Sequence, residues 1–228
     1  MIRAALLFLV MPAAAVASDL IPVPYDSLRS QPHRLETFDT LPSTPEPGIT
    51  FDHHWRAPGL SIAEHLAGQS VSETRTAEGR FDGLSGAPGT PLHVIAGPAN
   101  RNFTIAHHAG FDSNALFPVG PAGHNGIDGR GEGSIAMTFD DPQFAFGLRL
   151  HAEYADPFGQ RPNPGSARIT FYDASAHRLA SFSVPLTQGV MSLAWRSGSG
   201  VAAVTVENSD PGGIAIDDIL YAVELLSG

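Results

Sequence analysis

The sequence predicts an all-β protein, a jelly-roll β-sandwich of two antiparallel sheets. About a dozen short apolar segments alternate with a two-residue period, as strands do, and no segment has a convincing helical period. The chain also has 24 Gly and 19 Pro, and only 16% of its residues are charged, which favours strands and turns over helices. No repeat of fixed period and no shift in composition marks a second domain, so residues 34–228 are expected to form one sandwich.

The amino-terminal segment has the layout of a secretory signal peptide. Met1-Ile2-Arg3 precedes an apolar run, which ends at the small residues Ala15 and Ala17. An uncleaved membrane anchor is the alternative, but the run is short for a span of about 20 residues. The sequence therefore predicts cleavage after residue 17, no membrane span in the mature chain, and a secreted or periplasmic location. Residues 18–33, which carry several prolines, are expected to form an extended lead-in.

In the first half of the chain, short strand candidates are separated by long connections. Residues 69–91 and 110–133 are polar and rich in glycine, so they are expected to be loops, either functional or mobile. The strand candidates are residues 34–38, 49–55, 60–66, 92–96 and 102–106.

The segment 60–66 is ambiguous between a strand and a helix. Ser61 and Glu64 have the spacing of a helix capping box. The apolar residues of the segment alternate instead, as in a strand, and the strand interpretation is favoured.

In the second half, strands follow one another at regular spacing. Residues 201–224 are expected to form the last two strands, joined by a turn at residues 208–213. The preceding candidates are residues 134–139, 144–151, 167–172, 179–184 and 190–195.

Two carboxylates, Asp217 and Asp218, interrupt the apolar last strand. Adjacent strand residues point to opposite faces of a sheet, so at least one of them should lie near the core. A buried, unpaired carboxylate is costly. We therefore expect backbone donors, an arginine or a metal ion beside it.

Four pieces of sequence together carry a resemblance to a known group of proteins. They are ETFD at 36–39, PGLSIAE at 58–64 with Gly68-Gln69, FAFGL at 144–148 with ITFYD at 169–173, and GIAIDDI at 213–219. On these pieces the chain resembles exported bacterial jelly-roll domains, often found in proteins with a carboxy-terminal sorting tail, which look like carbohydrate-binding and galactose-binding-like modules. No sorting tail follows Gly228, which favours release or periplasmic residence over anchoring.

The resemblance implies a structural calcium ion between an early strand and the last one. Glu36 or Asp39 would then join Asp217 or Asp218, because calcium prefers several oxygen ligands. The alternative is that the aspartates cap a turn or pair with an arginine.

Aromatic and histidine residues supply the other candidate sites. Trp55 and Tyr154 border loops and are candidates for stacking on a sugar. One histidine of each adjacent pair, 53–54 and 107–108, could join Asp112 at a transition metal, although solvated histidines are the simpler interpretation.

Composition limits the function. The formal net charge is −10 and all 13 basic residues are arginine, which disfavours binding to nucleic acid or anionic membranes. The chain has no cysteine and no G-x-S-x-G motif, so nucleophilic catalysis is not indicated. The sequence therefore predicts a secreted, non-enzymatic binding module for a glycan or other extracellular ligand. A structural or adhesive envelope protein and a hydrolase are the alternatives, and a cleft of converging carboxylates or histidines would favour the hydrolase.

Overall fold

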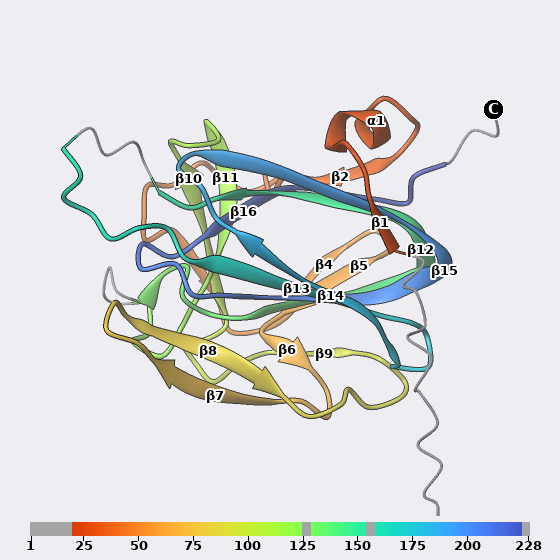
Figure 1. Cartoon of the computed structure of the whole chain (residues 1–228), viewed down its shortest axis with the longest axis horizontal. Helices are drawn as coiled ribbons and strands as arrows, with labels where there is room; N and C mark the ends of the chain where they lie inside the picture. Colours follow the sequence, from red (N-terminus) through yellow and green to blue (C-terminus); the bar gives the residue numbers. More distant parts are fainter. Residues whose placement is uncertain (1–19, 125–128, 154–157, 225–228) are drawn as a thin grey trace, which may run out of the picture.

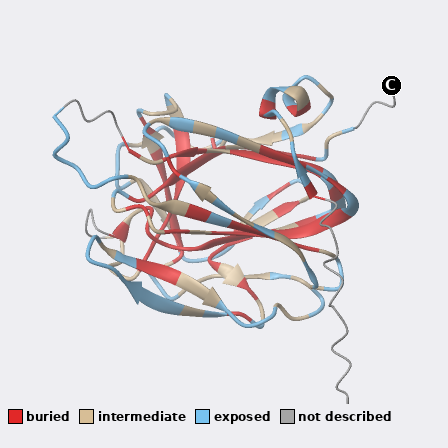
Figure 2. Cartoon of the chain, in the orientation of Figure 1, coloured by how far each residue is buried: buried red, intermediate tan, exposed pale blue. Residues whose placement is uncertain are grey.

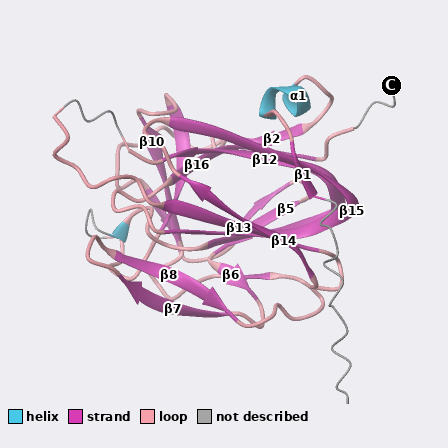
Figure 3. Ribbon diagram, in the orientation of Figure 1, coloured by secondary structure: helices cyan, strands magenta, loops and turns pink. Residues whose placement is uncertain are grey.

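A computed structural model describes residues 20–124, 129–153 and 158–224 and confirms the all-β class (Figures 1 and 3). Among these residues, no helix is long and apolar enough to cross a membrane. The early elements are β1 (Leu20–Pro22), α1 (Tyr25–Arg29), β2 (Arg34–Glu36), β3 (Ile49–Phe51), β4 (Trp55–Ala57), β5 (Leu60–Ala63), β6 (His65–Leu66), β7 (Ser70–Arg75), β8 (Arg80–Ser85) and β9 (Val94–Ile95). The later elements are β10 (Phe103–His108), β11 (Ser113–Pro118), β12 (Ile135–His151), β13 (Ser166–Tyr172), β14 (Arg178–Pro185), β15 (Val190–Asn208) and β16 (Ala215–Tyr221).

One large antiparallel sheet folds over itself to form the sandwich. Its strands run in the order β14-β13-β15-β12-β16-β11-β10-β3, with β1 on β15, β2 on β16 and β5 on β12. The long strands β12 and β15 pair with each other, and their register shifts between Thr138 and Ala145. Both strands bend there (Figure 1), so their two halves belong to different layers.

The core lies between the layers, where buried residues concentrate on the inner faces of the strands (Figure 2). Trp195 is 3% exposed and its ring centroid lies 5.0 Å from that of Phe171. Phe146 and Phe171, both fully buried, continue the same aromatic cluster. Trp195 is therefore a core residue.

The bend in β12 and β15 corrects the predicted strand boundaries. The sequence suggested separate strands at 134–139 and 144–151, because Asp140-Asp141-Pro142 resembles a turn. The segment is instead a bulged part of one strand, in which Gln143 pairs with Val201. Turn-type residues therefore mark the bend of a continuous strand.

The two predicted loops each contain regular structure. Residues 69–91 include the hairpin β7–β8, and residues 110–133 include β11. The hairpin was missed because most residues of β7 are exposed and polar, so they show no apolar alternation. β11 was missed because its short apolar run lies within a segment that is otherwise rich in glycine.

The lead-in at 18–33 also differs from the prediction. It contains β1 and the one-turn helix α1, whose Tyr25 and Leu28 are buried against Leu220. The segment 60–66 is strand, as favoured, but it breaks at Glu64 into β5 and β6. Residues 1–17, the predicted signal peptide, lie outside the described residues.

Candidate functional site

A pocket of about 240 Å³ lies where the carboxyl ends of β10 and β12 meet the connection between β15 and β16. We call it the histidine pocket. Phe117 and Ile214 supply apolar contacts in its wall. Its charged and polar lining consists of Glu46, His108, Arg130, His151, Glu153 and Arg161.

Two buried histidines form one wall of this pocket. His108 is the last residue of β10 and His151 the last residue of β12, and each is 4% exposed. Nε2 of His108 lies 3.0 Å from Nδ1 of His151, so one imidazole donates its N–H to the other. Gly110 permits this packing, because a Cβ at this position would lie 2.4 Å from Cδ2 of His151.

Burial keeps both imidazoles neutral. It lowers the pKa of His151 to about 4, and the neighbouring His108 lowers it further. Burial also lowers the pKa of His108, against the opposing effect of Glu46. Near neutral pH the pair therefore contributes hydrogen-bonding groups to the pocket but no charge.

Each arginine of the pocket is paired with a carboxylate. Nη1 of Arg130 donates to Oε2 of Glu46 at 2.9 Å, and Oε1 of Glu46 lies 3.4 Å from Nδ1 of His108. Nη1 of Arg161 donates to Oε2 of Glu153 at 3.1 Å. The two guanidinium groups thus balance the two carboxylates, and the lining has no net charge.

The turn between β15 and β16 walls the pocket on another side. Asp210, fully buried, accepts hydrogen bonds from the backbone N–H groups of Gly165 at 2.9 Å and Gly212 at 3.2 Å. A Cβ on Gly212 would lie 2.4 Å from Oε1 of Glu153. Glycine is therefore needed here for the turn to approach the carboxylate closely.

The two aspartates of the last strand have different environments, as alternation predicts. Asp217 is buried, and its carboxylate accepts hydrogen bonds from Oγ of Ser113 and from its neighbour's backbone N–H. Burial raises the pKa of Asp217 to about 7. Asp218 instead pairs with Nη1 of Arg149 at 3.0 Å, with Arg29 at 4.0 Å.

The other two predicted calcium ligands, Glu36 and Asp39, also have different hydrogen-bond partners. Oε1 of Glu36 accepts the N–H of Phe38, whereas Oδ1 of Asp39 accepts the N–H of Asn114. Asp39 and Asp217 accept hydrogen bonds from the adjacent residues Asn114 and Ser113, so both carboxylates lie at the start of β11. Within the described part of the chain, no three His, Asp or Glu side chains are grouped to hold a metal ion.

The predicted sugar-stacking residues do not line the histidine pocket. Trp55 packs edge-on against Phe38 and Phe51, with ring centroids 5.8 and 5.5 Å apart. Its ring thus forms part of the core boundary. Tyr154 lies outside the described residues.

The predicted histidine pairs also separate. Nε2 of His107 lies 3.8 Å from Oδ1 of Asp112 on the surface, while His108 turns inward to His151. His53 and His54 are exposed in the bend between β3 and β4. They therefore do not join the residues of the 107–112 segment at one site.

Sequence reasoning missed Glu46, Arg130, His151 and Arg161 as members of a site. Glu46 and Arg161 lie in proline-containing loops, and their distance from β10 and β12 along the chain gives no hint of contact. His151 had a usable signal, because a polar residue ending an apolar strand just before a long loop often lines a site.

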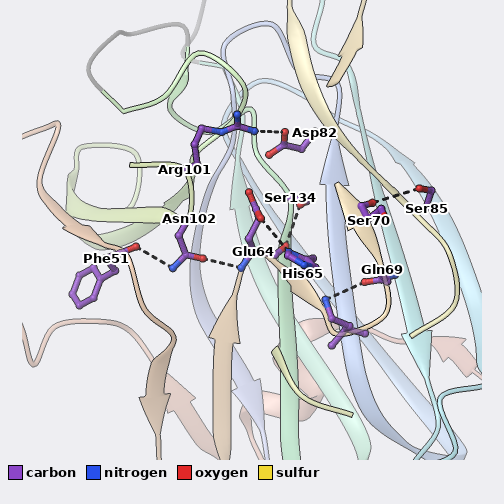
Figure 4. Close-up of polar contacts among 11 residues, drawn as sticks. Phe51, Glu64, His65, Gln69, Ser70, Asp82, Ser85, Arg101, Asn102 and Ser134 are labelled. Carbon is purple, nitrogen blue, oxygen red and sulfur yellow. Dashed lines mark hydrogen bonds and ion pairs between the residues drawn. The ribbon is translucent and has the colours of Figure 1, made fainter. Parts of the chain in front are cut away.

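A second polar cluster, shown in Figure 4, lies beneath the hairpin β7–β8. Asp82 in β8 forms an ion pair with Nη2 of Arg101 at 2.9 Å, and the Glu64 carboxylate points toward this pair. Burial raises the pKa of Asp82 to about 7, although Arg101 opposes the shift. Nδ1 of His65 lies 3.0 Å from Oε2 of Glu64.

The same cluster ties several loops to the main sheet. Asn102 accepts the backbone N–H of Glu64 at 2.8 Å and donates to the backbone oxygen of Phe51 at 3.0 Å (Figure 4). Oγ of Ser134 donates to the backbone oxygen of Glu64 at 3.1 Å. Glu64 and Asp82 are each 2% exposed, so the cluster serves mainly to hold these elements together.

No protein-family model matches the chain, and a search of curated proteins found no match.

Proposed function

We propose that the protein is a secreted, non-enzymatic module that binds a neutral glycan in the histidine pocket. The observation that carries the proposal is the charge balance of the lining, in which both arginines are paired and both histidines are neutral. An anionic ligand would have to compete with Glu46 and Glu153 for the two guanidinium groups, and it would be repelled by both carboxylates. A sugar offers hydroxyl groups that donate and accept hydrogen bonds, which suits the mixed donors and acceptors of the lining.

Binding to a neutral-glycan array, followed by isothermal titration calorimetry, tests the proposal. Replacing the rim residue in Arg161→Gln should weaken binding about tenfold, because a charge-assisted hydrogen bond is worth about 1.5–3 kcal/mol. Arg75→Gln, on the exposed hairpin, is the matched control and should bind as the wild type does. Failure of the wild type to bind any neutral glycan would refute the proposal.

A hydrolase is the second candidate, because carboxylates and histidines converge in a pocket. The hydrogen-bonded series Glu46, His108 and His151 has the composition of a general acid–base relay. If the protein hydrolyses its glycan, new reducing ends should appear with time. His151→Gln should then abolish turnover while leaving glycan binding measurable.

We also propose that a calcium ion, if bound, lies beside Asp39 and Asp217. These two carboxylates accept hydrogen bonds from the adjacent residues Asn114 and Ser113, which supports this pair. Asp218 is less suited, because it is already paired with Arg149.

A further inference from the structure

A second groove, of about 320 Å³, lies between the hairpin β7–β8 and the strands β13, β14 and β15. In Figure 1 the hairpin lies below these strands, at the end of the sandwich where β15 turns into β16. The lining comes from both walls, with Phe81 and Leu84 on the hairpin side and Arg168 and Glu207 on the sheet side.

Six of the residues that line this groove carry a hydroxyl group. Residues 72, 74 and 76 alternate along the hairpin, and three serines face them from the sheet. Each hydroxyl can donate one hydrogen bond and accept others. The six residues are Ser72, Thr74, Thr76, Ser166, Ser183 and Ser209.

The charges of the groove compensate one another. Nη1 of Arg168 lies 3.9 Å from Oε2 of Glu207. Asp82, at the base, is paired with Arg101. The charged groups of the groove thus already have partners, and Ser72, Thr76, Ser166 and Ser209 make hydrogen bonds within the protein. A neutral polyhydroxylated ligand would use the exposed hydroxyls of Thr74 and Ser183 and the remaining acceptor capacity of the other four.

The hairpin wall is fixed before any ligand binds. Oε1 of Glu207 accepts a hydrogen bond from the backbone N–H of Leu84 at 2.8 Å, and Nη2 of Arg101 donates one to Oδ1 of Asp82. Gly83 leaves the groove open opposite Ser72. A preformed groove spares a ligand the cost of ordering a loop.

The groove and the histidine pocket share one wall, the connection between β15 and β16. Asn208 and Ser209 border the groove, and Gly212 and Gly213 border the histidine pocket. The two sites are therefore separated by only a few residues of backbone, which Asp210 holds in place through Gly165.

From these observations we infer that the groove is a second subsite for a neutral oligosaccharide, occupied by sugar units of the same chain that enters the histidine pocket. The inference rests on the proposed function. It adds that recognition extends across the β15–β16 turn, so oligosaccharides bind more tightly than monosaccharides.

The test compares three proteins by calorimetry with a series of neutral oligosaccharides from the array, from monosaccharide to hexasaccharide. The groove variant Ser72→Ala/Thr74→Val/Ser183→Ala removes three exposed hydroxyls without changing the hairpin anchors. Its binding to the longer sugars should fall about tenfold, the effect of losing about 1.4 kcal/mol of hydrogen bonding, while monosaccharide binding is unchanged. The matched control is Ser70→Ala/Ser85→Ala, which alters hydroxyls of the same hairpin outside the lining.

The results separate this inference from the proposed function. If Arg161→Gln weakens oligosaccharide binding and the groove variant binds as the wild type does, the second subsite is refuted alone. If the groove variant weakens binding and Arg161→Gln does not, the groove is a saccharide site and the histidine pocket is not. Absence of binding by the wild type overturns both.

Discussion

At the scale of single residues, the adjacent carboxylates of β16 show how one position along a strand changes chemistry. Asp217 faces Ser113 in the interior, and its pKa is raised to about 7 by burial. Asp218 has a positive φ of 49° and turns to Arg149 at 3.0 Å. The first is a costly buried charge, and the second is one half of an ion pair.

We expect the two asparagine variants to have opposite effects on stability. Asp218→Asn removes the ion pair with Arg149 and should lower the free energy of unfolding by about 1–2 kcal/mol. Asp217→Asn removes a charge that is buried above pH 7, so it should be neutral or stabilising at pH 8. Urea unfolding in the presence of a chelator measures both, and equal effects would contradict this assignment.

Calcium binding at the same strand predicts a different response. An ion at about 100 times its dissociation constant adds about 2.7 kcal/mol of stability by mass action. For a domain of this size each kcal/mol shifts the melting temperature by about 2–4 °C, so chelation should lower it visibly. Asp217→Asn should remove the response, whereas Asp218→Asn should retain it. An unchanged melting temperature of the wild type with chelator would rule out the calcium ion.

At the scale of elements, the hairpin β7–β8 depends on side chains for its position. It pairs with no strand of the main sheet. Instead, Arg101 forms an ion pair with Asp82 in β8, and the Glu207 carboxylate accepts a hydrogen bond from the backbone N–H of Leu84. These contacts place a polar, exposed hairpin that has few apolar side chains to bury.

Replacing Arg101 should loosen this hairpin selectively. Arg101→Met leaves the Asp82 carboxylate buried without its partner, which should cost about 2–4 kcal/mol at pH 8. Hydrogen exchange of residues 70–85 should accelerate more than that of β12 and β15. Arg80→Met, on the same hairpin, is the control, and equal exchange in both variants would show that the ion pair does not anchor the hairpin.

The same elements show what the sequence could and could not predict. The strands of the second half were predictable, because β13, β15 and β16 carry runs of β-branched and bulky apolar residues that are mostly buried. The hairpin was not, since its position depends on Asp82 and Arg101, which are 19 residues apart. The histidine pocket was predictable only in part. His108 was a candidate ligand from the sequence, but its contact with His151 joins residues 43 positions apart. That contact depends on the order of the strands in the sheet, which the sequence does not show.

At the scale of the whole molecule, buried titratable groups act on stability in opposite directions. Burial raises the pKa of Asp82 and Asp217 from 3.8 to about 7. Their stabilising contribution is complete below pH 3.8 and is lost as the pH rises through 7. Burial lowers the pKa of His151 from 6.5 to about 4, so its contribution is complete above pH 6.5 and is lost as the pH falls through 4. Burial also lowers the pKa of His108, whose contribution is likewise complete above pH 6.5 and is lost at lower pH.

Between about pH 4 and 6.5 the two effects oppose each other, so the free energy of unfolding should change less than either set of groups alone would change it. Single variants should reveal how each set of groups makes the free energy of unfolding depend on pH. Asp217→Asn should make stability rise with pH in this window, and His151→Gln should make it fall. Urea titrations across the pH range measure this, and identical slopes in the two variants would disprove the offset.

The pairing of the early strands β1 and β2 with the late strands β15 and β16 affects the order in which the fold can form. Leu20 in β1 pairs with Ser197, and Leu35 in β2 pairs with Leu220. The earliest described residues thus find their partners only when the last strands have been synthesised. During vectorial emergence from a ribosome or a narrow channel, the sandwich cannot close until β16 is free. The last strands to be synthesised, β15 and β16, therefore complete the sheet.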